Sequence, residues 1–192
     1  MTGNTKEYIL KESLHLFSEK GYEASSVSDI AGRLSMSKSA LYKHYKNKRD
    51  ILDQILLLMQ DRQTEFKKEH TVCHEDGSVN LNKLEEYVYA LFRLWTEDEF
   101  CSSFRKILTL EQFGDAEMAE LYKEYLTQGP VFDLTNWFAS FGATKASAMG
   151  MAMYLYSPLY LYYSMYDSAE KKEIVTSAAK AHIHRFMMQL QV

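Results

Sequence analysis

Residues 26–52, SVSDIAGRLSMSKSALYKHYKNKRDIL, predict two short helices that are separated by a tight turn and followed by the start of a longer helix. Ser26 and Asp29 form a capping pair for the first short helix, because the hydroxyl accepts a free backbone N–H and the carboxylate lies at the positive end of the helix dipole. The apolar residues of this helix share one face: Val27, Ile30, Ala31 and Leu34. That face predicts packing against a core.

The second short helix is predicted over Lys38–Tyr45, with Ser37 as its N-cap and the turn at Ser35-Met36 before it. At about 100° per residue, Leu41 and Tyr45 lie on the side that faces the first helix. The opposite side carries polar and cationic residues: Ser39, Tyr42, Lys43 and Lys46. Such a helix suits the major groove of DNA, where phosphates need cations and base edges need hydrogen-bond donors.

The longer helix begins after Asn47, which is its N-cap, with Asp50 at the third position. Lys48 and Arg49 lie directly inside this cap, where the helix dipole disfavours each cation by about 0.3–1 kcal/mol. A bound anion would reverse this cost, because a helix N-terminus already favours phosphate. We therefore interpret Lys48 as an anchor for a phosphate of the DNA backbone.

Short helix-turn-helix units with a basic face also occur as plain corners of all-helical proteins, so the pattern alone leaves both interpretations open. Residues 24–52 also resemble the DNA-binding half of the tetracycline-repressor-like (TetR) family of bacterial regulators. The matching residues are Val27, Asp29-Ile30-Ala31, Ser37-Lys38, Leu41-Tyr42, His44-Tyr45, Lys48 and Leu52. Two residues depart from the family pattern, since Ser35 replaces the usual Gly and Tyr45 the usual Phe. A left-handed Ser35 would cost about 1 kcal/mol.

The resemblance implies an all-α fold with an N-terminal three-helix helix-turn-helix domain in residues 1–47. Residues 48–192 would form a helical regulatory and dimerisation domain. Composition agrees with a helical chain, since only 2 of the 192 residues are proline. Apolar spacing predicts a first helix over Asn4–Lys20, ended by Gly21, and a long helix over Lys48–Lys68. The long helix would join the two domains, and any signal between them would travel through it.

The charges are unevenly distributed. Residues 1–50 contain nine Lys/Arg and six Asp/Glu, a net of +3, whereas residues 51–192 contain thirteen and twenty, a net of −7. The overall charge of −4 therefore does not argue against nucleic acid as a partner. Because Met1–Lys11 is polar and two cysteines define no disulfide scaffold, a cytoplasmic protein is expected.

The resemblance also implies a set of DNA contacts, which includes Lys38. Ser39, Ala40 and Lys43 are expected to face bases, with Lys43 donating to guanine. The residues expected to hold the DNA backbone are Ser26, Ser37, Tyr42, His44 and Lys48. The partner would be a near-palindromic operator in double-stranded DNA, bound by a homodimer.

Beyond the long helix, further helices are predicted over Leu81–Trp95, Phe100–Phe113 and 115–128, and from Pro130 onward. Aromatic residues are dense in these helices. Core packing explains most of these aromatic residues. The alternative hypothesis is that some of them line an apolar cavity for a small-molecule effector, which the resemblance supports. The candidate ligand-binding residues are Trp95, Phe104, Phe113, Tyr122, Tyr125 and Trp137.

The polar loop of residues 70–80 contains His70, Cys73 and His74, whose spacing could hold a soft metal ion. A solvated loop explains the same residues, and no second ligand cluster lies near it in the sequence. We therefore expect neither a metal site nor another cofactor.

The 21 residues between Lys145 and Asp167 carry no charge and are long enough to span a bilayer. Six tyrosines, three serines and Pro158 argue against a membrane span. A helix that is apolar on all sides is buried on all sides, so a second copy of the chain is expected to cover it. The last helix carries its own apolar stripe: Ile174, Ala178, Ala181 and Phe186. Two helices from each copy would form a four-helix interface, where the family also dimerises.

Nothing in the sequence predicts catalysis, since it has no Gly-rich phosphate loop, nucleophile elbow, H-E-x-x-H or Cys-x-x-Cys motif.

We expect a ligand-responsive homodimeric transcriptional regulator, and in particular a repressor. A small molecule would release it from its operator by favouring a dimer form with wrongly spaced reading helices. The alternative is a helical small-molecule-binding protein, or an enzyme, in which the helix-turn-helix has no specific DNA target.

Overall fold

The computed structural model describes residues 2–190, with side chains from residue 5 onward. Within these residues the regular elements are α-helices, apart from an isolated β-bridge between Cys73 and Val79. The predicted all-α fold is therefore confirmed.

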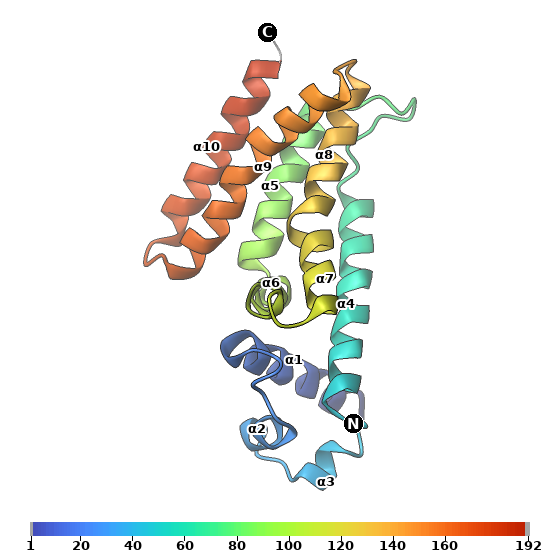
Figure 1. Cartoon of the computed structure of the whole chain (residues 1–192), viewed down its shortest axis with the longest axis vertical. Helices are drawn as coiled ribbons and strands as arrows, with labels where there is room; N and C mark the ends of the chain where they lie inside the picture. Colours follow the sequence, from blue (N-terminus) through green and yellow to red (C-terminus); the bar gives the residue numbers. More distant parts are fainter. Residues whose placement is uncertain (1, 191–192) are drawn as a thin grey trace. The chain divides into compact units, whose positions relative to one another are not determined.

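The chain divides into two compact units, whose helices can be followed in Figure 1. Unit 1 consists of Met1–Phe66 and Glu99–Glu120, and unit 2 consists of Lys67–Asp98 and Leu121–Val192. Unit 1 is larger than the predicted DNA-binding domain of residues 1–47, because the N-terminal helices pack with segments from later in the chain. The functional boundary at residue 47 stays a prediction.

Unit 1 is built from short and long helices around one apolar core. It contains α1 (Thr2–Lys20), α2 (Val27–Arg33), α3 (Lys38–Leu41), all but the end of α4 (Lys48–Glu69), α6 (Glu99–Glu111) and the start of α7 (Ala116–Leu126). Helix α1 packs against α2 and α6, and α2 packs against α3. The buried side chains include Leu14, Phe17, Ile30, Leu41, Leu52, Phe104 and Ile107.

The first helix and the residue that ends it agree with the prediction to within two residues. Helix α1 begins at Thr2 rather than Asn4, whose side chain lies outside the described ones, and it ends at Lys20. Gly21 follows with φ +91°, and its N–H donates to the carbonyl of Phe17 at 2.9 Å. A Cβ at Gly21 would lie 2.6 Å from Oε1 of Glu111 on α6. The left-handed backbone conformation therefore favours glycine, whereas the Glu111 carboxylate oxygen, at the end of a flexible side chain, could move aside.

Unit 2 is a bundle of four main helices, together with the end of α7. They are α5 (Leu81–Glu97), α8 (Gln128–Ser140), α9 (Lys145–Ser168) and α10 (Lys172–Leu190). Helix α9 packs against α5, α8 and α10 (Figure 1). Inside the bundle, the ring of Phe92 stacks on that of Tyr163 at 5.6 Å, and Phe138 packs on Phe186 at 5.6 Å.

The loop of residues 70–80 is a small hairpin rather than an unstructured loop. Across the Cys73–Val79 bridge, the His74 N–H donates to the carbonyl of Ser78 at 2.8 Å. Val72 is only 4% exposed and anchors the hairpin. Among the described residues, no group of three or more His, Cys, Asp or Glu side chains is arranged to hold a metal ion.

Helix α9 is buried on one side and exposed on the other within a single chain. Ala152, Leu155 and Leu159 are buried, whereas Tyr154 and Leu161 are 63% and 60% exposed. The exposed side is the one that the sequence assigns to a second copy. No described helix combines the length and the hydropathy that crossing a bilayer requires.

The predicted stripe of α10 divides between two sides of that helix. Phe186 is buried in the bundle, whereas Ile174 is 61% exposed and Ala181 is also exposed. The buried side is formed instead by Val175, Ala179, Ile183, Phe186 and Met187.

Candidate functional site

A complete capping box sets the start of α2. The backbone N–H of Asp29 donates to Oγ of Ser26 at 3.2 Å, and the backbone N–H of Ser26 donates to Oδ2 of Asp29 at 2.8 Å. The Ser26 hydroxyl also donates to Oδ2 of Asp29, and these bonds lower the pKa of the carboxyl group. The predicted cap is confirmed, and it fixes the direction in which the chain enters the helix-turn-helix.

The turn between α2 and α3 is tight and left-handed at Ser35, whose φ is 53°. The N–H of Met36 donates to the carbonyl of Ala31 at 2.9 Å, which closes the end of α2. Ser37 then caps α3, because its Oγ accepts from the N–H of Ala40 at 3.2 Å. The departure from glycine at Ser35 therefore leaves the turn intact, at the expense of a strained residue.

The predicted length of the second helix is wrong. Helix α3 spans only Lys38–Leu41, instead of Lys38–Tyr45. Beyond Leu41 the N–H groups of Lys43 and His44 donate to the carbonyls of Ala40 and Leu41, three residues back, at 3.3 and 2.9 Å. The Tyr45 N–H keeps four-residue spacing, to the Leu41 carbonyl at 3.1 Å. The chain thus continues as a turn, which lets Tyr45 reach the core, and the segment 38–44 still presents one outer side.

Two side chains hold this segment from behind. Leu41 is 1% exposed and Tyr45 is 5% exposed, in agreement with their predicted inward direction. The Tyr45 hydroxyl donates to the carbonyl of Lys6 on α1 at 3.2 Å, and burial raises the pKa of Tyr45 to about 12. The hydroxyl that distinguishes Tyr45 from phenylalanine therefore ties the segment to α1.

Most of the predicted DNA-binding residues are exposed in unit 1. Within the segment 37–44 the exposed ones are Ser37, Lys38, Ser39, Tyr42 and Lys43, and Ser26 is exposed at the start of α2. Ala40 and His44 are half-buried. This surface, which we call the reading face, presents hydroxyls, a phenol ring and cations at the positions that the sequence predicts.

The cations around the reading face fall into two groups. Residues 30–49 contain no Asp or Glu and six cations: Arg33, Lys38, Lys43, Lys46, Lys48 and Arg49. Arg33 is paired with Glu12 and Glu19 at 3.0 and 2.7 Å. In the described part of the chain, Lys38, Lys43 and Lys46 form no ion pair, and all three are exposed. The unpaired positive charge therefore lies on and next to the reading face.

Lys48 is engaged inside the protein instead of projecting freely. Its Nζ donates to the carbonyl of Tyr22 at 2.8 Å and lies 4.1 Å from the centroid of the Tyr22 ring. The side chain is half-buried. An ammonium has three N–H donors, so one such bond leaves donors for a phosphate. Lys48 thus connects the start of α4 to the α1–α2 loop, a contact that its position in the sequence does not reveal.

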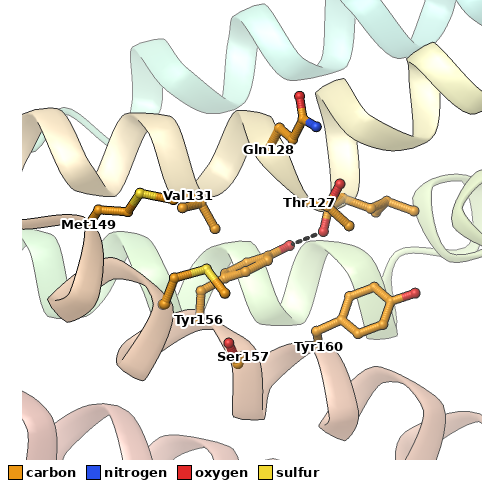
Figure 2. A pocket seen from close by; sticks show the side chains of 9 residues that line it. Thr127, Gln128, Val131, Met149, Tyr156, Ser157 and Tyr160 are labelled. Atoms are coloured by element: carbon orange, nitrogen blue, oxygen red, sulfur yellow. Dashed lines mark hydrogen bonds between the residues drawn. The ribbon is translucent and has the colours of Figure 1, made fainter. Parts of the chain in front are cut away.

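A second candidate site is a cavity of about 460 Å³ in unit 2. It is bordered by side chains from the end of α7, from α8 and α9, and from the connection before α8 (Figure 2). Its apolar lining is formed by Leu126, Val131, Met149, Met153, Tyr156 and Tyr160. The sequence does not predict the four of these on α9, because the uncharged stretch 146–166 indicates only core packing and an interface. The helical spacing of hydroxyl-bearing and thioether side chains in this stretch is the sequence feature that could indicate a ligand cavity.

The six aromatic residues predicted to bind a ligand are distributed differently. Phe104 is fully buried in unit 1, and Phe113 is 91% exposed. In unit 2, Trp95 packs edge-on against Tyr125, and Trp137 packs against Tyr87 and lines a separate recess with Asp133. None of the six lines the 460 Å³ cavity, although the hydroxyl of Tyr122 bonds to that of Tyr160, which does.

Comparison with known proteins identifies similar sequences over the helix-turn-helix segment. Residues 9–55 match the family model of bacterial regulatory proteins of the tetR family. The biofilm operon icaADBC HTH-type negative transcriptional regulator IcaR of Staphylococcus epidermidis is 41% identical over 46 residues, 24% of this chain and 25% of the relative. The HTH-type transcriptional regulator YerO of Bacillus subtilis is 43% identical over 47 residues, 24% of this chain and 16% of the relative. The matches thus span a quarter or less of these relatives' length.

Solved structures are similar over nearly the whole chain. A TetR-family transcriptional regulator from Bordetella parapertussis has a TM-score of 0.69 at 16% identity, covering 95% of this chain and 94% of the other. The fatty acid degradation regulator FadR from Bacillus halodurans has a TM-score of 0.64 at 15% identity, with the same coverages. At this level of identity the similarity shows the fold.

Proposed function

We propose that this chain, which belongs to the TetR family of bacterial regulatory proteins, is a transcriptional repressor that binds double-stranded DNA through its reading face. The observation that carries the proposal is the distribution of cations. Arg33 and Arg49 are neutralised by carboxylates, whereas Lys38, Lys43 and Lys46 on and beside α3 are exposed and have no ion-pair partner among the residues that the structure describes. Unpaired cations on a rigid, core-backed surface favour a polyanionic partner.

The residues of the reading face, together with Lys48, divide into base contacts and backbone contacts. Ser39, Ala40 and Lys43 would face base edges in the major groove, with Lys43 donating to guanine. The remaining polar residues would hold phosphates: Ser26, Ser37, Lys38, Tyr42, His44 and Lys48. In this proposal residues 1–47 are the DNA-binding domain, and residues 48–192 are the regulatory and dimerisation domain.

A homodimer is proposed from two exposed apolar stripes in unit 2. On α9 the stripe consists of Tyr154, Leu161 and Met165, which are 63%, 60% and 45% exposed. On α10, Ile174, Ala181 and Met188 recur every seven residues and are all exposed. Apolar seams at this spacing favour helix–helix packing, and a two-fold symmetric partner covers both seams at once. A two-fold dimer would read a near-palindromic operator.

The regulation would follow from a small molecule that binds residues 48–192. Such an effector shifts the dimer only by the difference in its affinity for the two states. An effector that prefers a form with wrongly spaced reading faces would release the DNA, and DNA would weaken effector binding by the same factor.

A direct test is fluorescence anisotropy with a labelled duplex from the promoter beside the protein's own gene. Lys43→Ala should cost about 1–3 kcal/mol of binding to the specific duplex, because a base contact is lost. Lys145→Ala makes the same charge change at the start of α9 and should leave the affinity unchanged. Equal affinities for the wild type and Lys43→Ala would refute the assignment of the reading face.

A further inference from the structure

The 460 Å³ cavity in unit 2 lies in the size range of small-molecule sites. Leu126 and the buried Tyr156, which is 3% exposed, form its inner part. Its outer part contains Met149 and Met153, which are 54% and 45% exposed. Figure 2 shows Met149, Val131 and Tyr156 around one common space. The cavity is therefore closed on its inner side and open to solvent past two methionines.

The lining carries no formal charge. The residues that are not apolar are Thr127, Gln128 and Ser157, so none of the nine lining residues is Asp, Glu, Lys, Arg or His. A ligand with a net charge would lose hydration in this cavity and find no opposite charge, at a cost of several kcal/mol. The lining therefore selects against ions.

The two phenols of the lining are already used within the protein. The Tyr156 hydroxyl donates to the carbonyl of Leu126 at 2.9 Å, and burial raises the pKa of Tyr156 far above its usual value. The Tyr160 hydroxyl is bonded to that of Tyr122. Among the described residues, the side chains of Gln128 and Ser157 form no hydrogen bond, and both are exposed at the opening. Polar recognition is thus available at the opening, and the inner part offers mainly apolar contact.

We propose that this cavity is the effector site and that its ligands are uncharged, mainly apolar molecules of the size of a two- or three-ring aromatic compound. The proposal rests on the proposed function, in which an effector regulates DNA binding. The apolar body would contact Leu126, Val131 and Tyr156, and a single polar end would meet Gln128 or Ser157 at the opening. Met149 and Met153 have unbranched, flexible side chains, so they would close over ligands of different shape.

The test compares two probes that share the N-phenylnaphthylamine skeleton, the neutral N-phenyl-1-naphthylamine and the anionic 1-anilinonaphthalene-8-sulfonate. Fluorescence titration of the purified full chain should show at least about tenfold tighter binding of the neutral probe, since the anion must be desolvated. Equal affinities, or tighter binding of the anion, would overturn the proposed ligand class.

Two variants test whether the neutral probe binds in this cavity. Met153→Glu places a charge at the cavity from an exposed helix position, and it should weaken binding of the neutral probe by about tenfold or more. Leu110→Glu makes a similar change at a position on α6 that is 52% exposed, and it should leave the affinity unchanged. If Met153→Glu binds the neutral probe as well as the wild type does, the probe lies elsewhere and the proposal fails.

DNA binding measured on the same preparations separates this proposal from the proposed function. The neutral probe should weaken operator binding by the wild type and not by Met153→Glu. If the wild type has no specific DNA site while Met153→Glu still abolishes probe binding, the proposed function fails and the ligand class stands. If operator binding is specific but a bound neutral probe leaves it unchanged, the effector role of this cavity is overturned.

Discussion

Arg49 at the start of α4 forms a two-point ion pair with Glu117 at the start of α7, with Nη2–Oε1 and Nη1–Oε2 distances of 2.7 and 2.5 Å. Arg49 also donates to Asp53 at 2.7 Å. On α1, Lys11 pairs with Glu99 of α6 at 2.8 Å. The N-terminal helices are therefore fastened to α6 and α7 as well as continuing into α4. The expectation that a signal travels through the long helix stays a prediction, and α6 and α7 are further elements in contact with the N-terminal helices.

These contacts predict that acid weakens unit 1. Arg49, Arg33 and Lys11 lower the pKa values of Glu117, Glu19 and Glu99, and Ser26 lowers that of Asp29. Carboxyl groups with a lowered folded-state pKa stabilise above their ordinary values, 4.5 for Glu and 3.8 for Asp, and lose this contribution as the pH falls through the lowered values. Stability of unit 1 should thus fall below pH 4.5.

The order of acid unfolding can be followed because Trp95 and Trp137 both belong to unit 2. Far-UV circular dichroism should decrease before tryptophan fluorescence changes. Asp29→Asn should flatten the pH dependence of stability, whereas Asp76→Asn in the hairpin of unit 2 should leave the early phase unchanged. Tryptophan fluorescence that changes first would contradict the prediction.

Ser35→Gly is expected to stabilise the protein. Ser35 has φ 53°, a left-handed conformation that costs a non-Gly residue about 1–2 kcal/mol, part of which is offset by the greater entropy of glycine in the unfolded chain. The net gain should be up to about 1 kcal/mol in chemical denaturation. Ser35→Ala keeps the strain and should bring no such gain; a larger gain from alanine would argue against strain at this turn.

Lys48→Ala tests the two roles of that side chain separately. Losing the bond to the Tyr22 carbonyl and the contact with its ring should reduce the free energy of unfolding by about 1–2 kcal/mol. Losing a phosphate contact should weaken binding to all duplexes alike. It should also reduce the steepness of the plot of log binding constant against log salt concentration by about 1. A stability loss with an unchanged salt slope would leave Lys48 a purely internal contact.

Leu161→Glu should dissociate the proposed homodimer. A carboxylate in an apolar helix–helix seam is left without a partner, so sedimentation velocity should show a shift from dimer to monomer. Leu110→Glu is the matched control, because Leu110 is similarly exposed but lies on α6 of unit 1. A dimer that persists in Leu161→Glu would place the interface elsewhere.

Local features of this chain could be predicted from the sequence, because neighbouring residues determine them. The capping box of Ser26 and Asp29, the left-handed Ser35 and the start of α4 after Asn47 depend on interactions within a few residues. The length of α3 could not be predicted in this way, because it depends on how the Tyr45 side chain packs against α1.

Contacts between residues that are far apart in the sequence also could not be predicted from it. The pairing of Arg49 joins residues 68 apart, and the bond from Lys48 to Tyr22 joins residues 26 apart. Apolar spacing shows that a helix has an apolar side, but it does not show which aromatic side chains border a cavity. Phe113, a predicted ligand residue that is 91% exposed, illustrates that limit.

Selection from a pool of random duplexes by the purified protein tests the reading face most directly. The account predicts enrichment of a near-palindrome whose half-sites are separated by about a whole number of duplex turns, and relaxed preference at one position of each half-site for Lys43→Ala. The absence of any enriched sequence at low salt, with a folded dimer present, would contradict it.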